Sequence, residues 1–443
     1  MKNQVKIKKN INPFKKEINV SSDKSISIRC LLLSSIAIGR SKIFNILESE
    51  DVINTLRSLK KIGVNFKQRK NYLEVYGVGI NGFNIKKKKT TLNAGNSGTL
   101  ARSILGLCSS INNKIKLIGD KSLSKRDFSR VIKPLNLFGV SIRSRKGMLP
   151  LDLIGSEFLR PIKFVEHKGS AQIKTCIILS AINTHGITKI KAIKSRDHTE
   201  LMLKSFNYPI KIVRKKKYDL IDVEGMKQFK SFEYKVPGDI SSASFFIVLT
   251  LLSKNSELLI KNININPSRI GIIKILNLMN AQIRIINKKK YKGEKIGDIK
   301  IKSVNNFKSI NCPKSLNSFA IDEFILIFLI ACKSKGISKF KNLEELNQKE
   351  SPRLDIAIKF MQMIGIKVVR KNNDIKIYGN PYLNLTGNYH IKNFLKDHRI
   401  FMMSVIAALT LGGESWTIND KDSIKSSFPD FIKIIRKLGG KIN

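Results

Sequence analysis

Hydrophobic positions along this chain recur in one arrangement that is repeated six times. In each copy, apolar residues spaced for one face of a helix lead to a glycine or asparagine, and two short strands around a basic turn follow. The residues that end the six helices suit the left-handed conformation that closes a helix, and they are Gly63, Gly139, Asn207, Asn280, Gly365 and Gly439. The number of residues between successive helix ends exceeds the roughly 20 to 50 residues of a solenoid repeat, and it predicts that each copy is a βαβαββ-like subdomain.

Six such copies predict an α/β (α+β) protein of two domains with three copies in each. The last copy ends before its closing strand, so we expect residues 4–11 to supply that strand, which places both termini in the second domain. Proline and glycine interrupt the pattern near Val20-Ser21 and Val236-Pro237-Gly238, where we place the crossovers. The predicted domains are 21–236 and 1–20 with 237–443, and the length of 443 residues is sufficient for two cores.

The charge of the chain is strongly positive. Lys and Arg number 82 against 33 Asp and Glu, for a formal net charge of +49, a balance typical of proteins that bind nucleic acid or anionic membranes. The lysines are nevertheless spread over the whole length among Ile and Asn, and runs such as 215–217 and 288–290 predict solvated turns. We therefore expect neither nucleic acid nor a membrane as the partner.

Cysteine usage and the N-terminus indicate a cytoplasmic protein. The five cysteines are far apart and mostly lie in apolar runs, as reduced core residues do. Neither cysteines nor histidines show the spacing of zinc ligands. The first 16 residues lack the apolar stretch of a signal peptide, and no segment approaches the roughly 20 apolar residues of a membrane span.

Two segments carry candidate anion-binding chemistry. If a helix begins near Ser27, then Lys24, Ser25 and Arg29 gather at its N-terminus, where free amides and the helix dipole attract anions. In residues 93–102, Gly98 would let a ligand approach the backbone closely at a second helix start. The alternatives are a capped helix with two exposed cations for the first segment and a plain helix-entry turn for the second.

Together with further short motifs, these segments resemble the 5-enolpyruvylshikimate-3-phosphate (EPSP) synthase family. The motifs stand in the family's order, and besides residues 21–30 and 93–102 they are 119–126, 169–172, 195–200, 238–244, 321–323, 349–353, 397–399 and 427–430. The resemblance implies the enolpyruvyl transferase fold, with two domains of three βαβαββ units each and a substrate cleft between them.

The resemblance also implies a reaction in the shikimate pathway to chorismate and aromatic amino acids. The enolpyruvyl group of phosphoenolpyruvate is transferred to the 5-hydroxyl of shikimate 3-phosphate, and phosphate is released. No metal or organic cofactor is implied, and the partners are these two small molecules. We expect the protein to act as a monomer.

The family's functional residues carry over onto matching positions of this chain. Shikimate 3-phosphate is expected to contact Lys24, Ser25, Arg29, Ser170, Ala171, Gln172, Ser195, Asp322 and Lys349. Phosphoenolpyruvate is expected to contact Lys24, Gly98, Arg126, Gln172, Arg353, Arg399 and Lys425. The expected catalytic residues are Asp322 at the hydroxyl, Glu350 at the methylene carbon, and Lys24. Without the resemblance, Asp322 would be interpreted as a helix cap and Glu350 as a capping or surface residue.

Several positions depart from the family's pattern. Pro352 replaces a usual acidic residue, Asn347 a common arginine and Asp127 a usual proline, and Glu345 stands where some members carry an asparagine that contacts shikimate. A lysine that binds phosphoenolpyruvate in some members aligns with Ser426 without a gap, so Lys425 is one residue out of register.

Three alternative functions remain at this stage. A UDP-N-acetylglucosamine enolpyruvyl transferase shares the fold, but it typically has Asn after the first lysine and a loop cysteine near Arg126, whereas here Ser25 follows Lys24 and no cysteine lies between Cys108 and Cys176. A nucleic-acid-binding relative is favoured by the charge and by the existence of RNA-terminal cyclases built from related units, but the sequence shows no ATP-binding motif and no interleaving of aromatic and basic residues. An inactive relative would be expected to lose the charged site residues.

Overall fold

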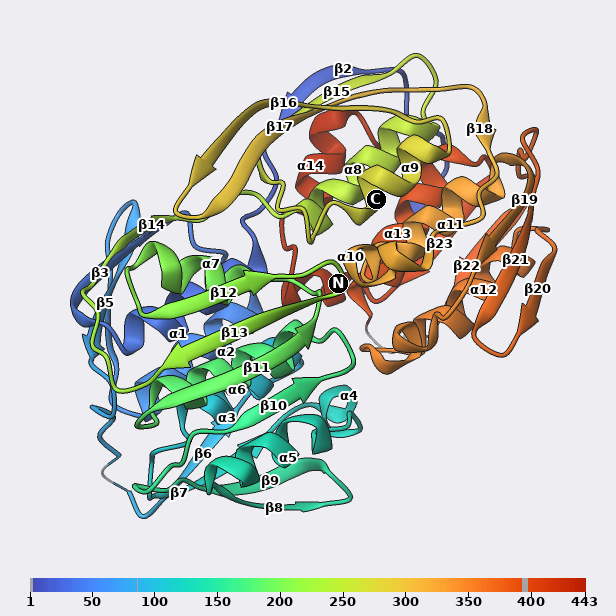
Figure 1. Ribbon diagram of the computed structural model, residues 1–443. Coiled ribbons are helices and arrows are strands. Elements are labelled where there is room, and N and C mark those ends of the chain that lie inside the picture. The colour runs from blue at the N-terminus through green and yellow to red at the C-terminus, as the bar shows by residue number, and fades with distance from the viewer. Residues whose placement is uncertain (1–2, 86, 393–396) are drawn as a thin grey trace. The chain divides into compact units, whose positions relative to one another are not determined.

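The computed structural model describes residues 3–85, 87–392 and 397–443, and it divides into two compact units (Figure 1). The N-terminal unit comprises Ser22–Val236 and Lys290–Glu294, and the C-terminal unit comprises Met1–Ser21, Pro237–Lys289 and Lys295–Asn443. Each unit encloses its own apolar core.

The N-terminal unit repeats one βαβαββ arrangement three times. The second copy consists of β6 (Lys89–Asn93), α3 (Gly98–Leu107), β7 (Lys114–Ile118), α5 (Ser129–Phe138), β8 (Ser141–Arg145) and β9 (Met148–Ile154), with a short α4 (Lys121–Ser124) before α5. Its sheet has the order β6-β7-β9-β8, in which β6 and β7 are parallel and β9 is antiparallel to both of its neighbours.

The other two copies of this unit follow the same plan. The third has the sheet order β10-β11-β13-β12 and consists of β10 (Lys163–Glu166), α6 (Ala171–Ile182), β11 (Ile187–Ile193), α7 (His198–Ser205), β12 (Ile210–Arg214) and β13 (Tyr218–Glu224). The first has the order β14-β3-β5-β4 and consists of α1 (Lys24–Ser35), β3 (Ile38–Phe44), α2 (Glu50–Lys61), β4 (Asn65–Gln68), β5 (Tyr72–Val78) and β14 (Glu233–Lys235).

The C-terminal unit contains the remaining three copies. One has the order β16-β17-β15-β2, from β2 (Lys15–Ile18), α8 (Ile240–Leu252), β15 (Glu257–Asn264), α9 (Gly271–Leu278), β16 (Gln282–Tyr291) and β17 (Glu294–Lys302). The next has the order β18-β19-β21-β20, from β18 (Phe307–Lys308), α11 (Phe324–Cys332), β19 (Ser334–Phe340), α12 (Arg353–Met363), β20 (Val368–Lys371) and β21 (Asp374–Gly379), with η1 (Lys314–Leu316), α10 (Asn317–Ala320) and η2 (Glu344–Gln348) in its loops.

The last copy is completed from the other end of the chain. It consists of β22 (Asn388–Ile391), α13 (His398–Thr410), β23 (Ser415–Asn419), η3 (Lys421–Ser426) and α14 (Phe431–Leu438). β1 (Gln4–Ile7) pairs antiparallel with β23, so the prediction that the N-terminal segment supplies the missing strand is confirmed for these four residues. The six predicted helix ends are confirmed as well, since each of those Gly and Asn residues has a positive φ.

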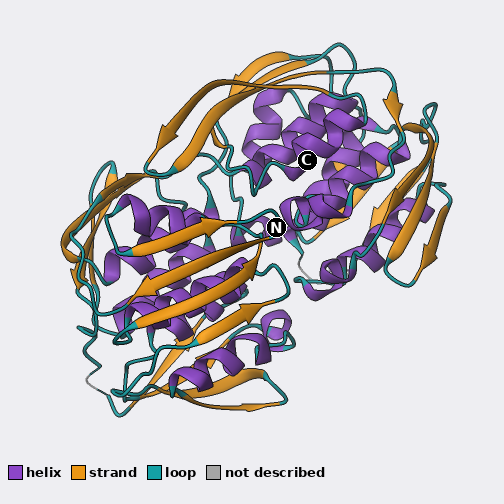
Figure 2. Ribbon diagram, viewed as in Figure 1, coloured by secondary structure: helices purple, strands orange, loops and turns teal. Residues whose placement is uncertain are grey.

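Each copy pairs an inner helix with an outer helix. The inner helices α1, α3, α6, α8, α11 and α13 are buried on nearly every side, whereas the outer helices such as α2, α5 and α14 bury one face. Figure 2 shows the helices of each unit covered by its strands. An inner helix is therefore fixed on all sides by packing, and its N-terminus is a rigid place for functional groups.

The sequence pattern missed the length of the β16–β17 hairpin. We predicted a turn at Lys288–Lys290, but these exposed lysines lie within β16, so that prediction is wrong. The hairpin turns at Lys292 and Gly293, and its tip belongs to the N-terminal unit, where buried Glu294 lies 2.6 Å from Nδ1 of His198. The sequence pattern did not reveal the contact between His198 and Glu294, because these residues are 96 positions apart.

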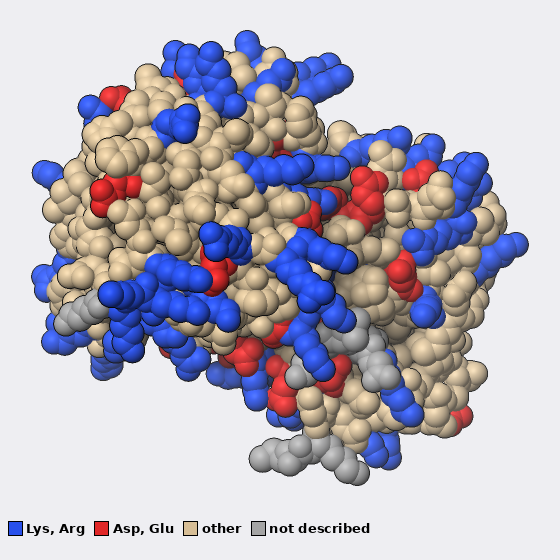
Figure 3. All heavy atoms as spheres, turned by 90° about the horizontal axis from the view of Figure 1, so that it is seen from below, with Lys and Arg blue, Asp and Glu red and all other residues tan. Residues whose placement is uncertain are grey.

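Lys and Arg cover much of the face shown in Figure 3 and are most crowded at its lower left, and Asp and Glu lie among them over the rest of this face. Among the described residues, no single helix is long and apolar enough to cross a membrane. One bent pair, Lys314–Ala320 with Phe324–Cys332, meets the test only when its two members are taken together, and every residue of α11 is buried in the core.

Replacement of Gly365 tests whether the left-handed conformation at a helix end contributes to stability. Its φ is +76° and nothing lies within 4 Å of the place where a Cβ would stand, so only backbone strain opposes a side chain. We expect Gly365→Ala to lower the free energy of unfolding by about 1–2 kcal/mol in urea titrations. Gly365→Asn is the matched variant and should cost less, because asparagine occupies this position in two other copies. Equal stability of Gly365→Ala and the parent would contradict the account.

Candidate active site

The residues with predicted roles cluster at helix N-termini in both units. In the N-terminal unit they lie at the starts of α1, α3 and α6 and in the loops before α5 and α7. In the C-terminal unit they precede or open α11, α12 and α13, apart from Lys425, which lies within η3. Free backbone amides and the positive end of the helix dipole make such positions suitable for anions.

The first residues of α1 form a connected polar group. The helix begins at Lys24, three residues earlier than predicted, because the Asp23 side chain caps it by accepting from the Ile26 amide (2.9 Å). Nζ of Lys24 donates to Asp51 at 2.8 Å. Arg29 lies one turn farther and is only 3% exposed.

Arg29 is fixed by oxygen atoms from three elements. Its Nε donates to Oγ1 of Thr199 (2.8 Å) and its Nη2 to Oγ1 of Thr175 (3.0 Å), while Nη1 donates to the carbonyl of Ser25. The two threonine hydroxyls also hydrogen-bond to each other. The guanidinium is therefore held in one orientation before any ligand binds.

Gly98 opens α3 beside a group of hydrogen-bond donors. A Cβ on Gly98 would lie 2.9 Å from Nη1 of Arg102, 3.0 Å from Nη1 of Arg126 and 3.8 Å from Nε2 of Gln172. Arg126 is held by Asn96 (2.7 Å), and Arg102 donates to Oε1 of Gln172 (2.9 Å). Only glycine leaves this space open, and its donors suit the oxygens of a small anion.

Two serines with predicted roles lie near the starts of α6 and α7. Ser170 caps α6 by accepting from the Ile173 amide (3.4 Å), and Ala171 is the first helical residue. Ser195 is 5% exposed, and among the described residues its Oγ has no hydrogen-bond partner. An unsatisfied buried hydroxyl costs free energy, so this atom is suited to a ligand.

In the C-terminal unit, Arg353 lies among three carboxylates. It opens α12, it is 1% exposed, and it contacts Asp397 (2.9 Å), Asp322 (3.4 Å) and Glu350. Burial alone would lower the pKa of the Arg353 guanidinium, but the charges of Asp397, Glu350 and Asp322 outweigh burial and raise that pKa. Arg353 is therefore permanently charged and holds the two predicted catalytic carboxylates close to one cation.

Asp322 is surrounded by further cations. Nζ of Lys349 lies 3.6 Å from its carboxylate, and Arg399 donates to its backbone carbonyl at 3.0 Å. The alternative role as a helix cap is not observed, because the cap position of α11 is Glu323. The structure thus brings together five predicted residues, which are Asp322, Lys349, Glu350, Arg353 and Arg399.

Lys425 is more exposed than these five residues. Its side chain is 60% exposed and its Nζ pairs with Asp422 at 2.7 Å. The neighbouring Ser426 is the residue that an alignment without a gap places at the family's lysine. Its hydroxyl lies 3.3 Å from Nδ1 of His398, which precedes Arg399 in the sequence.

Sequence analysis did not select several residues that hold the site in place. Asp397 binds Arg353 and also caps α13 through the Arg399 amide (2.9 Å), and it belongs to the motif at 397–399. Arg102 could have been found from its position one helical turn after Gly98. Asn347, which replaces a common arginine, caps α12 by accepting from the Leu354 amide (3.0 Å). No local pattern in the sequence indicates that Asp51 pairs with Lys24.

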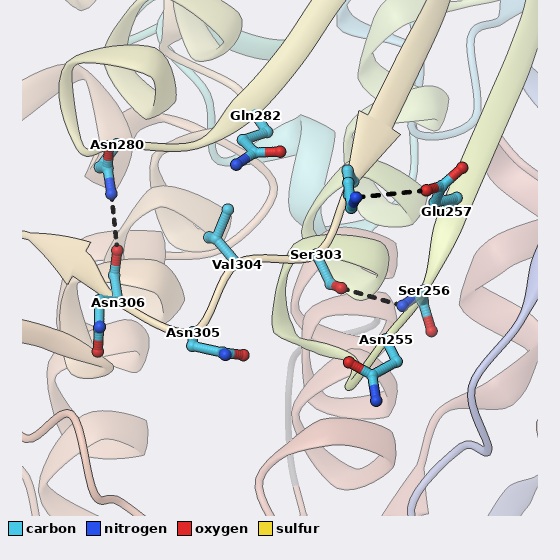
Figure 4. A pocket seen from close by; sticks show the side chains of 10 residues that line it. Asn255, Ser256, Glu257, Asn280, Gln282, Ser303, Val304, Asn305 and Asn306 are labelled. Carbon is cyan, nitrogen blue, oxygen red and sulfur yellow. Dashed lines mark hydrogen bonds and ion pairs between the residues drawn. The ribbon is translucent and has the colours of Figure 1, made fainter.

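One pocket of the C-terminal unit lies away from these groups, whereas Lys425 lines another. Figure 4 shows a polar pocket of about 570 Å³ in the C-terminal unit, lined at the starts of β15 and β16 by Asn255 and Asn280. It includes none of the residues with predicted roles. Within the part of the chain that the structure describes, no group of three or more His, Cys, Asp or Glu could hold a metal ion.

Comparison with known proteins shows the family to which the chain belongs. Residues 8–435 match the family model described as EPSP synthase (3-phosphoshikimate 1-carboxyvinyltransferase). Curated proteins named 3-phosphoshikimate 1-carboxyvinyltransferase from Ruthia magnifica subsp. Calyptogena magnifica and from Petrotoga mobilis are 39% identical over 430 residues and 37% identical over 443 residues. These alignments cover 96% and 99% of both chains, respectively.

Solved structures agree with the family match. The EPSP synthase from Acinetobacter baumannii has a TM-score of 0.85 at 31% identity and covers 99% of both chains. The enolpyruvyl transferase NikO from Streptomyces tendae, at a TM-score of 0.74 and 14% identity, covers 99% of this chain and 98% of its own and supports the enolpyruvyl transferase fold alone. The predicted fold class is confirmed, and the chain belongs to the EPSP synthase family of enzymes.

Proposed function

We propose that this enzyme transfers the enolpyruvyl group of phosphoenolpyruvate to the 5-hydroxyl of shikimate 3-phosphate and releases phosphate. This reaction is a step in the synthesis of chorismate and aromatic amino acids. Family membership supports the reaction type. The observation that carries the assignment to this chain is the close grouping of Asp322, Glu350 and Arg353, since the transfer needs two proton-handling groups and a fixed cation.

Binding must overcome the repulsion between two anionic substrates. Both carry a phosphate and a carboxylate, and their repulsion grows as water leaves the site. For shikimate 3-phosphate we propose Lys24, Ser25, Arg29, Ser170, Ala171, Gln172, Ser195, Asp322 and Lys349. Arg29 is already oriented by hydrogen bonds, and among the described residues Oγ of Ser195 has no hydrogen-bond partner. Both observations support the assignment, because neither side chain has to rearrange when the ligand binds.

Phosphoenolpyruvate is proposed to bind Lys24, Gly98, Arg126, Gln172, Arg353, Arg399 and Lys425. The donors that surround the space beside Gly98 suit phosphate oxygens. Planar guanidinium groups such as those of Arg353 and Arg399 match the two oxygens of a carboxylate. Lys425 is the most exposed of these groups, so we expect it to contribute least.

The proton steps are assigned to two carboxylates. Asp322 accepts the proton of the 5-hydroxyl as its oxygen bonds to C2 of phosphoenolpyruvate, and Glu350 delivers a proton to the methylene carbon. In the second step the bond between C2 and the phosphate oxygen breaks as the methyl group loses a proton to Glu350. The departing phosphate takes up the proton that Asp322 had accepted, so both carboxylates return to their starting states. Lys24 stabilises the negative charge on the reacting groups. Charge balance is kept because each carboxylate alternates between its two protonation states.

The acceptor distinguishes this proposal from a UDP-N-acetylglucosamine enolpyruvyl transferase. We expect the purified protein to release phosphate from phosphoenolpyruvate when shikimate 3-phosphate is added, and not when UDP-N-acetylglucosamine is added. A colorimetric phosphate assay with each acceptor measures this directly. Release with the nucleotide sugar alone would overturn the assignment.

Replacement of Glu350 tests its role as the acid that protonates the methylene carbon of phosphoenolpyruvate. We expect Glu350→Gln to lower kcat by about 10²- to 10⁴-fold because the amide cannot donate a proton in this step. Steady-state kinetics measures the effect, and circular dichroism checks that the variant is folded. Glu344→Gln, an exposed carboxylate of η2, is the matched control and should keep the parent kcat. A Glu350→Gln enzyme with the parent kcat would contradict this role.

A further inference from the structure

A buried carboxylate fills the loop that leads into α6. Glu166 ends β10 and is only 2% exposed, and its two oxygens accept from the amides of Lys168 and Gly169, each at 2.8 Å. The amide of Ser170 also bonds to this carboxylate. Gly169 has a φ of +65°, and this left-handed residue helps to turn successive amides toward one point. Such a concave row of amides is an anion-binding nest, and here a side chain occupies it.

The surroundings of Glu166 tie the loop to the body of the unit. Lys174 lies one turn into α6 and is 1% exposed, and its charge faces Glu166 and pairs with Glu200 at 2.6 Å. Glu200 belongs to α7, next to Thr199, which holds Arg29. Burial raises the pKa of Glu166, whereas the three amides and Lys174 oppose that shift. The charged form therefore depends on these neighbours.

We propose that Glu166 is a positioning residue for substrate binding. By holding the amides of residues 168–170, it fixes the loop that ends at Ser170, and with it the hydroxyl of that residue. The inference rests on the proposed function, in which Ser170 contacts shikimate 3-phosphate. Its consequence is specific: the loop amides are already occupied, so Ser170 serves the substrate through its O–H group. That hydroxyl oxygen accepts from the Ile173 amide, which leaves its hydrogen for the ligand.

Glu166→Gln tests the proposal with little change of shape. The amide group of glutamine places N–H donors opposite a backbone N–H, so it cannot accept from the amides at both ends as the carboxylate does. We expect KM for shikimate 3-phosphate to rise by about 10- to 100-fold, because small displacements of binding groups have effects of this size. At saturating shikimate 3-phosphate, kcat and KM for phosphoenolpyruvate should stay within about threefold, as for a lost ground-state contact.

Hydrogen exchange of the ligand-free protein provides a second readout that needs no substrate. The amides of Lys168 and Gly169 should exchange faster in Glu166→Gln than in the parent. Glu224→Gln is the matched control, because Glu224 is 44% exposed and pairs with Lys227 on the surface. It should change neither readout. Glu166→Asp, which keeps the charge but shortens the reach, replaces Glu166→Gln if that variant fails to fold, and the same rise in KM is expected.

The outcomes separate this inference from the proposed function. An unchanged KM for shikimate 3-phosphate in an active, folded variant would overturn the positioning role. So would a parallel loss of kcat, both KM values and melting temperature, which indicates a general packing role. If the parent enzyme itself shows no activity with shikimate 3-phosphate, the proposed function fails, and the exchange rates still decide whether Glu166 orders the loop.

Discussion

Buried cations in this protein are fixed by oxygen atoms that the chain supplies, and the most extensive example joins the N-termini of the inner helices of the C-terminal unit. Arg269 donates to Asp239 and Ser241 at the start of α8, Ser241 donates to Glu323 before α11, and Glu323 faces Arg399 of α13. Removing one partner from such a buried pair costs about 3–5 kcal/mol, because a charge is left unpaired. The network therefore holds the cations in place before a substrate arrives.

The N-terminal unit reaches a similar result with different groups. Hydroxyl and carbonyl oxygens orient Arg29, Asp51 pairs with Lys24, and Glu200 pairs with Lys174. In both units, the groups lie where an inner helix begins or a neighbouring loop ends. The sixfold repeat explains this placement, because each copy packs one helix inside its unit and leaves that helix's N-terminus as a rigid, electropositive position.

Local patterns in the sequence predicted most of the fold. The helix ends at residues such as Gly139 and Asn280 could be predicted because left-handed closure needs particular residue types, and β1 could be assigned because the last copy lacked a strand. The site could be predicted only in part. Arg353 and Arg399 follow from motifs, whereas Asp51 acts through a contact with Lys24, 27 positions away, that no local pattern encodes. The long β16–β17 hairpin was missed for the same reason.

The pair of Arg353 and Asp397 tests the central claim most directly, since both side chains are at most 1% exposed and they lie 2.9 Å apart. The measurement is a double-mutant cycle in urea unfolding with Arg353→Met, Asp397→Asn and the double variant. We predict that each single change costs about 3–5 kcal/mol and that the double variant loses less than the sum by more than about 1 kcal/mol. Additive losses would show that the two charges do not depend on each other and would contradict the account.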